Sequence, residues 1–261
     1  MKTPATDTMV LRLGRLIDRT MQPVLDTRRV FRAIREYPWF WRSFREYSRK
    51  SAERLRLLDL YPQLGERRAL AGIASGDYFH QDLWAARKVF QSGVTEHFDV
   101  ASRVDGFVAH CAVFTKVIYV DVRPLPSDIR NIETRSGQLG QLPFDDGSVS
   151  SLSCLHVVEH VGLGRYGDPI DPQGTLKALA DLQRVLAPKG NLYLGLPIGR
   201  ARVCFNAHRI TNPDQVLSAM SQLELVDFAA VDGTGSFVDG GQPDAYREVE
   251  YACGLFHFRR P

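Results

Sequence analysis

The chain has 261 residues, of which 44% are hydrophobic and 24% charged, and its formal net charge is +3 at pH 7. These values are typical of a globular protein with a sizeable core, and the charge is too small to indicate a nucleic-acid partner. No stretch approaches the roughly 18 consecutive apolar residues of a membrane helix. The N-terminal sequence MKTPATDTMVLRLGR has no apolar segment followed by a small-residue cleavage site. The four cysteines are scattered, which favours reduced thiols and a cytoplasmic protein.

Residues 1–75 are expected to form an N-terminal helical extension rich in arginine and aromatic residues. Pro38 and Pro62 predict the boundaries of two helices. The apolar positions that recur at helical spacing in the first helix are Val30, Phe31, Ile34 and Tyr37. A cationic face with Trp and Phe favours a membrane surface, whereas arginine and aromatic enrichment is also typical of protein interfaces. The segment therefore predicts a peripheral membrane contact, a dimer contact or docking on the core.

Residues 76–261 are expected to form one α/β domain, because short apolar runs alternate there with helical stretches. The expected strands are 97–101, 117–122, 151–157, 191–197, 223–231 and 251–258. The expected helices are 80–91, 105–114, 174–186 and 212–221. This alternation predicts right-handed crossovers and a mainly parallel sheet. The last two strands are joined by a loop without a helical pattern, which predicts a terminal antiparallel hairpin.

A ligand of such a sheet binds beyond the carboxyl ends of the strands, and the turn after Asp99 reaches that edge. Ala101, Ser102 and Gly106 are small enough there for a ligand to approach the backbone closely. A helix that begins near Asp105 would point free N–H groups at the ligand. The turn is thus a candidate cofactor site.

Two further segments reach the same edge. Asp121 ends the second strand, and its carboxylate can accept both ribose hydroxyls of an adenosine. The turn-rich loop 138–148 precedes the third strand, and Gln138 there can hydrogen-bond an adenine edge. An adenosine-containing cofactor is the expected ligand.

The sequence HVVEH, residues 156–160, matches the H-x-x-E-H zinc motif of inverzincin peptidases. Zinc binding by that motif requires a helix that places the two histidines one turn apart. His156 follows the apolar run SLSCL and is expected on a strand or turn. No metal site is predicted.

The loop 162–174 is dense in glycine, proline and carboxylates, and would lie over the place of a second substrate. Arg165, Tyr166, Asp168 and Asp171 can bind a polyol, or an anionic group through Arg165. Equally, the loop can be a structured Ω-loop whose aspartates cap turns and the following helix.

The sequence FNAHR brings Asn206, His208 and Arg209 to the same end of the sheet. Histidine is the side chain best suited to accept a hydroxyl proton near neutral pH. We therefore expect His160 or His208 to act as a base, with Glu159 or Asp168 orienting it or binding the substrate.

The stretch LPFDDGSVSSLSCLHVVEHVG, followed by LQRVLAPKGNLYLGLP, resembles the core of class I S-adenosylmethionine (SAM) methyltransferases. Within that class, the series YFHQDLW, SRVDGFVAH, DVRPL, SLSCLHVVEHVGLGRYGDPID and FNAHR is similar to the DUF268 group. The resemblance implies the class I SAM methyltransferase (Rossmann-like) fold. That fold has a mainly parallel seven-stranded sheet with a C-terminal antiparallel hairpin, here preceded by the N-terminal helical segment.

The resemblance also implies SAM as the cofactor, with Asp99 as the acidic residue of the first motif, Asp121 on the ribose and Gln138 at the adenine edge. The full expected cofactor set is Asp99, Ala101, Ser102, Arg103, Gly106, Asp121, Val122, Gln138, Leu139 and His156. One departure is that the usual glycine-rich turn D/E-x-G-x-G-x-G here carries Ala101, Arg103 and Asp105. Arg103 replaces a glycine that makes room for the amino acid end of the cofactor.

The expected activity is O-methylation of a sugar or another small hydroxylated acceptor. The expected substrate-binding set is Arg165, Tyr166, Asp168, Asp171, Asn206 and Arg209. One alternative is a non-catalytic methyltransferase-like module, associated with polysaccharide synthesis, whose SAM site is degenerate. Another is NAD-dependent oxidoreduction, which suits Asp121 but not the terminal hairpin.

Overall fold

The computed structural model describes residues 27–53, 55–70, 72–123 and 125–261. The chain divides into two compact units, Met1–Ile73 and Ala74–Pro261. The N-terminal sequence MKTPATDTMVLRLGR, in which we expected no secretory signal, lies outside the described residues. Within the described ranges, none of the helices has the length and apolar character needed to cross a bilayer.

Helix α2, Thr27–Lys50, dominates the described part of the first unit and continues through Pro38. The expected break at Pro38 is therefore corrected. Proline removes one backbone hydrogen bond from a helix interior, but edge-to-face aromatic pairs link the turns around it. These pairs are Tyr37–Phe40, Phe40–Trp41 and Trp41–Phe44, with ring centroids 6.3, 5.4 and 5.8 Å apart.

The segment after α2 contains two single helical turns, Leu57–Asp59 and Glu66–Arg68, in place of the expected second helix. Arg67 joins this segment to α2. Its guanidinium lies 4.8 Å from the ring centroid of Trp39 and 4.0 Å from the carboxylate of Glu36. Glu36 is buried at this contact.

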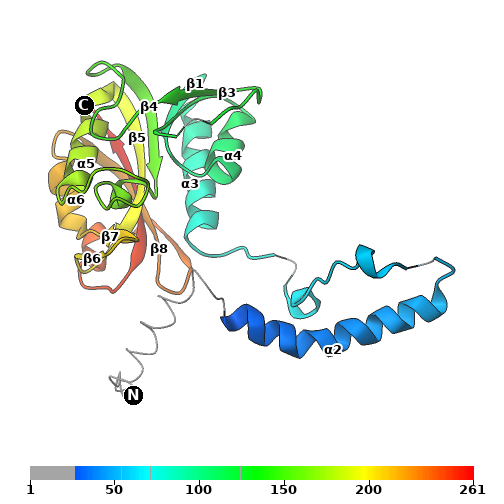
Figure 1. Cartoon of the computed structure of the whole chain (residues 1–261). Helices are drawn as coiled ribbons and strands as arrows, with labels where there is room; N and C mark the ends of the chain where they lie inside the picture. Colours follow the sequence, from blue (N-terminus) through cyan, green and yellow to red (C-terminus); the bar gives the residue numbers. More distant parts are fainter. Residues whose placement is uncertain (1–26, 54, 71, 124) are drawn as a thin grey trace. The chain divides into compact units, whose positions relative to one another are not determined.

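The second unit contains an eight-stranded sheet in the order β3-β2-β1-β4-β5-β10-β8-β9 (Figure 1). Its strands are β1 Glu96–Val100, β2 Lys116–Asp121, β3 Ile132–Ser136, β4 Val149–Leu155, β5 Leu186–Ile198, β8 Glu224–Val231, β9 Phe237–Asp239 and β10 Ala252–Arg259. Strands β3, β2, β1, β4 and β5 are parallel, whereas β10 is antiparallel to both β5 and β8. A separate ribbon pairs β6 Arg202–Cys204 with β7 His208–Ile210.

The expected mainly parallel sheet with a terminal antiparallel pair is confirmed, and the sheet contains one strand more than expected. The short β9 pairs with β8 at the sheet edge, so the sheet has eight strands where we expected seven. Strand β3 was also missing from the expected strands, because IETRS has a single apolar residue, Ile132. An edge strand can be this polar because only part of its surface is buried.

Helices cover both faces of the sheet (Figure 1). The helices of one face are α3 Asp77–Ser92 and α4 Ala109–Ala112, and those of the other are α5 Gly174–Val185 and α6 Pro213–Ala219. Trp84 and Val89 of α3 pack in one core cluster with Tyr193 of β5, while Leu179 and Leu182 of α5 lie in the other. The sheet is thus buried on both faces, as its continuous apolar strands predict.

The expected helix 105–114 is interrupted at Gly106, whose φ of −126° and ψ of −105° are not helical. A helical turn, Val104–Val108, precedes α4 there. A Cβ atom on Gly106 would lie 2.1 Å from Oδ2 of Asp82 on α3. Glycine is therefore required for the close approach of α3. Gly106, an expected cofactor-binding residue, lines neither of the cavities described below.

The carboxyl ends of β1 and β4 each continue into one residue with a left-handed backbone. Ala101 follows β1 and His156 follows β4, and both have φ of 56°. Such a conformation costs roughly 1–2 kcal/mol for a non-glycine residue, and backbone hydrogen bonds hold it here. The Ala101 N–H donates to Val120 O at 2.9 Å, and the His156 N–H donates to Gly195 O at 2.8 Å. Both turns direct the chain across the edge where ligands bind in this class of sheet.

Candidate functional site

Two adjoining cavities open at the carboxyl ends of the parallel strands. The larger has a volume of about 980 Å³ and the smaller about 100 Å³. Their walls share Ala101, Arg123, His156, His160 and Tyr166. The larger volume is within the range of small-molecule sites.

Asp99, at the end of β1, is fully buried and lines neither cavity. Its Oδ1 accepts a hydrogen bond from Ser102 N at 3.0 Å, and its Oδ2 accepts from the hydroxyls of Ser102 and Ser153 at 2.6 and 2.5 Å. Burial raises the pKa of Asp99 to about 6. Asp99 was expected among the cofactor-binding residues, and the structure shows its side chain holding the turn through Ser102 and Ser153.

His97 continues this buried network from the middle of β1. Its Nδ1 lies 2.8 Å from Ser151 Oγ and its Nε2 lies 2.9 Å from Ser153 Oγ. Because the Ser153 hydroxyl donates to Asp99, the Nε2 of His97 must carry the proton that Ser153 accepts. Complete burial lowers the pKa of His97 to about 3, so the ring is neutral.

Asp121, at the end of β2, lines the smaller cavity with Val122, Gln138 and Leu139, three further residues of the expected cofactor set. Its carboxylate is engaged by Arg123, whose N, Nε and Nη2 donate at 2.8, 3.0 and 2.9 Å. Burial favours the neutral acid, but these donors outweigh it and lower the pKa of Asp121. Asp121 is therefore a carboxylate at neutral pH.

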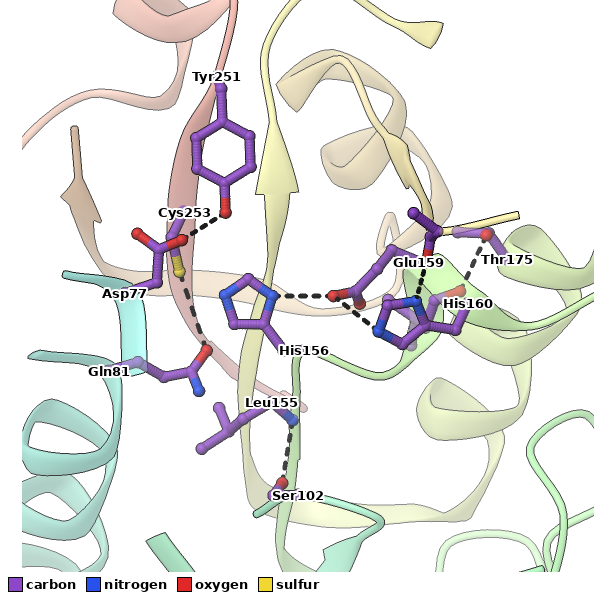
Figure 2. Close-up of polar contacts among 12 residues, drawn as sticks. Asp77, Gln81, Ser102, Leu155, His156, Glu159, His160, Thr175, Tyr251 and Cys253 are labelled. Carbon is purple, nitrogen blue, oxygen red and sulfur yellow. Dashed lines mark hydrogen bonds and ion pairs between the residues drawn. The ribbon is translucent and has the colours of Figure 1, made fainter. Parts of the chain in front are cut away.

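His156, Glu159 and His160 meet on the wall of the larger cavity (Figure 2). Glu159 Oε1 lies 2.8 Å from Nδ1 of His156 and 3.7 Å from Nε2 of His160. His156 precedes a single helical turn, Val158–His160, so it does not share an α-helix with His160. The helical form of the H-x-x-E-H zinc motif is therefore not present. Among the residues that the structure describes, no group of three or more His, Cys, Asp or Glu is arranged to hold a metal.

The two histidines differ in charge. Burial alone would lower the pKa of His156, but neighbouring Cys253 and Glu159 outweigh it, and we take the Glu159 carboxylate as the cause of the raised pKa. Burial lowers the pKa of His160. The His160 Nδ1 lies 2.7 Å from the Ala207 carbonyl, which can only accept, so Nδ1 carries the proton and Nε2 is free to accept one.

The loop expected to bind the acceptor is organised largely by its own aspartates. Asp168 lines the smaller cavity, but its carboxylate accepts backbone N–H bonds from Gly162 and Tyr166 at 2.6 and 3.2 Å. Asp171 lines neither cavity; it accepts from Gln173 N and pairs with Lys177 at 2.7 Å. These contacts are those of an Ω-loop whose aspartates cap turns, the alternative that the sequence left open.

Arg209 and Asn206 also lie outside both cavities. Arg209 donates to the carbonyls of Val161 and Asp171 and to Thr175 Oγ1, which fastens the loop to β7. Asn206 is exposed in the β6–β7 turn. Of the expected substrate-binding residues, Asp171, Asn206 and Arg209 thus lie outside the two cavities.

The remaining expected residues do line the larger cavity. They are Ala101, Ser102, Arg103, His156, Glu159, His160, Arg165, Tyr166 and His208. The guanidinium of Arg103 pairs with Asp105 at 3.0 Å and lies 4.9 Å from the ring centroid of Tyr78, and a volume of about 980 Å³ stays open beside these three wall residues. Burial lowers the pKa of half-buried His208.

Sequence reasoning missed several residues of this wall. Asp77 at the start of α3 accepts a hydrogen bond from the Tyr251 hydroxyl, just before β10 (Figure 2). These two residues are far apart in the sequence, and no local pattern joins them. Arg123 carried a usable signal, because it follows the strand-end Asp121 by two residues.

Comparisons with known proteins agree with this fold. Residues 147–232 match a family model described as "Caenorhabditis protein of unknown function, DUF268", which confirms the expected resemblance over that segment. No curated protein matches the chain.

Two solved structures resemble the second unit. The N-methyltransferase NodS from Bradyrhizobium japonicum WM9, in complex with S-adenosyl-L-homocysteine (SAH), is similar with a TM-score of 0.51 and 16% identity, over 71% of this chain and 89% of that one. The [4+2]-cyclase SpnF has a TM-score of 0.52 and 13% identity, over 70% of this chain and 80% of that one. The likeness confirms the class I SAM methyltransferase-like fold, while the different activities in the two names show that the fold does not fix the reaction.

Proposed function

We propose that this protein transfers a methyl group from SAM to a hydroxyl group of a small, sugar-like acceptor. The observation that carries the proposal is that the two cavities meet at His160, whose lowered pKa makes its imidazole neutral. The smaller of the two is also lined by the strand-end carboxylate Asp121. The fold shared with NodS, an N-methyltransferase crystallised with SAH, supports SAM as the donor.

The residues present fit this cofactor. Asp121 and Gln138 line the smaller cavity, where a carboxylate and an amide can bind a ribose and an adenine edge. Arg103 leaves the larger cavity open for the amino acid end. When bound, SAM would supply a methyl group made electrophilic by its sulfonium.

His160 is the base that we assign to the reaction. Its Nδ1–H is held by the Ala207 carbonyl, and its lowered pKa keeps the ring neutral at pH 7. Nε2 can therefore accept the proton of an acceptor hydroxyl. Glu159, 3.7 Å from Nε2, then stabilises the imidazolium that forms, and it is itself positioned by His156. His208, on the wall of the larger cavity, is the alternative base.

The donor is tested by calorimetric titration with SAM and, separately, with SAH. We expect both to bind, and we expect Asp121→Ala to weaken both by about tenfold or more, because a charge-assisted bond is lost. Absence of binding to a protein shown to be folded would reject the proposal.

The base is tested by turnover once an acceptor is found. His160→Ala should lower the rate by about 10²-fold or more while SAH affinity is unchanged. His110→Ala is the matched control, because this exposed histidine on α4 lies outside both cavities. The rate of the wild-type enzyme should fall on the acid side, with a midpoint below the ordinary histidine value of 6.5, since protonation removes the base.

A non-catalytic binding module, associated with polysaccharide synthesis, is the second candidate. Ala101 and Arg103 in place of glycines, together with Arg123 on Asp121, favour it. In that case the folded wild-type protein would bind neither SAM nor SAH.

We further propose that the protein is cytoplasmic and that α2 binds the surface of an anionic membrane. Residues 27–50 contain eight arginines or lysines and two glutamates. The apolar or aromatic side chains exposed on this helix include Val30, Phe31, Ile34, Tyr37 and Trp41. An apolar stripe flanked by cations is typical of interfacial helices.

The full chain should sediment with vesicles of phosphatidylcholine and phosphatidylserine, but not with phosphatidylcholine alone. The variant F31S/I34S should lose this binding. Leu58→Ser is the control, because Leu58 is 98% exposed in the same unit but lies outside α2. Unchanged vesicle binding in F31S/I34S would contradict the binding of α2 to a membrane surface. So would a variant that changes its oligomeric state instead of losing vesicle binding.

A further inference from the structure

Two arginines stack on Tyr166, the aromatic residue between the two cavities. The guanidinium carbon of Arg123 lies 4.8 Å from the ring centroid, and that of Arg165 lies 5.2 Å from it. All three side chains line the larger cavity. Two cations are thus held on one ring in the wall of the larger cavity.

The two guanidinium groups have different partners. Arg123 pairs with Asp121 at 2.9 Å, whereas Arg165 donates to the Ala207 carbonyl at 2.9 Å. Among the described residues, no carboxylate lies within ion-pair distance of Arg165. Since His160 bonds to the same carbonyl, the Arg165 charge is fixed beside the proposed base.

Several carboxylates around the cavity are engaged. Asp105 pairs with Arg103, Asp168 accepts backbone N–H groups of its own loop, and Glu159 bonds to His156 through Oε1, while its buried Oε2 has no hydrogen-bond partner. Glu159 Oε2 is therefore left for a hydroxyl of the acceptor, and Arg165 for an anionic group on it. The chemistry of the wall favours an acceptor with a negative group.

Asp121 cannot serve Arg123 and a ribose at once. Its two oxygens accept four hydrogen bonds, three from Arg123 and one from the Tyr119 hydroxyl. A carboxylate has about four acceptor positions, so two ribose hydroxyls must displace the Arg123 side chain. The exchange is feasible, because the Arg123 side chain is 61% exposed and the ribose hydroxyls replace the hydrogen bonds that it gives up at Asp121.

We propose that Arg123 and Arg165 bind an anionic group of the methyl acceptor on either side of Tyr166, and that the cofactor completes this site. When the ribose takes Asp121, the Arg123 guanidinium is released beside Arg165, so the cofactor binds first and the acceptor second. A carboxylate or a phosphate fits, because arginine binds both through paired N–H bonds. This inference rests on the proposed function.

The experiment measures anion binding with and without saturating SAH, at constant ionic strength. SAH is used because its sulfur is neutral, whereas the sulfonium of SAM would itself attract an anion. The probes are glucuronate and glucose 6-phosphate, with glucose as the uncharged control. We expect SAH to tighten binding of at least one anionic probe by about tenfold, within the usual range of coupling between sites, and to leave glucose unchanged. The two probes distinguish a carboxylate site from a phosphate site.

Variants assign the effect to the two arginines. Arg165→Gln should lose anion binding in both conditions. Arg123→Gln should bind SAH as tightly as the wild type or more tightly, because the side chain that competes for Asp121 is gone. In this variant SAH should no longer tighten the binding of the anionic probe. Arg259→Gln is the control, because this exposed arginine at the end of β10 lines neither cavity.

The outcomes separate the two proposals. If SAH binds but the anionic probes bind equally with and without it, or glucose binds as tightly as they do, the inference is overturned while the cofactor assignment stands. If SAH tightens anion binding equally in Arg123→Gln, the release of Arg123 is overturned. If SAH does not bind to the folded protein, both proposals fail.

Discussion

The ends of β1 and β2 place an aspartate each at the same edge of the sheet, yet the two carboxylates do different things. Asp99 is fully buried, is held by serine hydroxyls and has a raised pKa. Asp121 lines a cavity, pairs with an exposed arginine and has a lowered pKa. A strand-end carboxylate is therefore enclosed or open to a cavity according to what covers it, and not according to its place in the sequence.

The largest expected effect is on stability at the end of β1. Asp99→Ala removes the acceptor of three buried donors on Ser102 and Ser153. We expect it to lower the free energy of unfolding at pH 7 by about 2–3 kcal/mol, since each unsatisfied group costs about 1–3 kcal/mol and relief of a buried charge offsets part of this. Urea denaturation measures it. A change close to zero would place Asp99 with Asp121 as a ligand-binding group.

The corresponding change at the end of β2 should affect binding and spare stability. In Asp121→Ala the free energy of unfolding should fall by about 1 kcal/mol or less, because the Arg123 partner is exposed and only the Tyr119 hydroxyl is left buried. A loss as large as that of Asp99→Ala would remove the distinction between the two strand ends.

The pH dependence of stability distinguishes two buried groups of β1, Asp99 and His97. The folded pKa of Asp99, about 6, exceeds its ordinary 3.8, so the folded state binds a proton more tightly and gains stability as the pH falls from 6 to 3.8. The folded pKa of His97, about 3, lies below its ordinary 6.5, so stability is lost as the pH falls through 6.5. In Asp99→Asn, only the loss of stability with falling pH that His97 causes remains.

We therefore expect the stability of Asp99→Asn, measured against the wild type, to fall between pH 6 and pH 4. Denaturation at a series of pH values tests this. A difference between the two proteins that stays constant with pH would show that Asp99 does not titrate in this window.

The smallest expected effect is in the loop between β4 and α5. Asp171→Asn should change the free energy of unfolding by no more than about 0.5 kcal/mol, because its partner Lys177 is exposed. It should leave SAH and anion binding unchanged, because Asp171 lines neither cavity. Weaker binding of glucuronate in this variant would return Asp171 to the acceptor site.

The sequence predicted the strands that are buried on both sides. The runs VIYVD and SLSCL lie in β2 and β4, because a continuous apolar run is stable only where both faces of a strand are covered. It did not predict β3, a polar edge strand, or the interruption of the helix at Gly106, which depends on the approach of Asp82 from α3. It also expected a helix break at Pro38 that the neighbouring aromatic pairs bridge.

Local periodicity and the order of the strands were enough to predict the alternation of strands and helices, the terminal antiparallel pair and the position of Asp121, His156 and His160 at the carboxyl edge. The pairing of the carboxylates could be read from the folded chain alone, because it depends on residues far apart in the sequence, such as Asp77 with Tyr251. The tertiary structure also decided that Arg123 and Arg165 share Tyr166, since their side chains meet only when the loops after β2 and β4 fold over the same cavity.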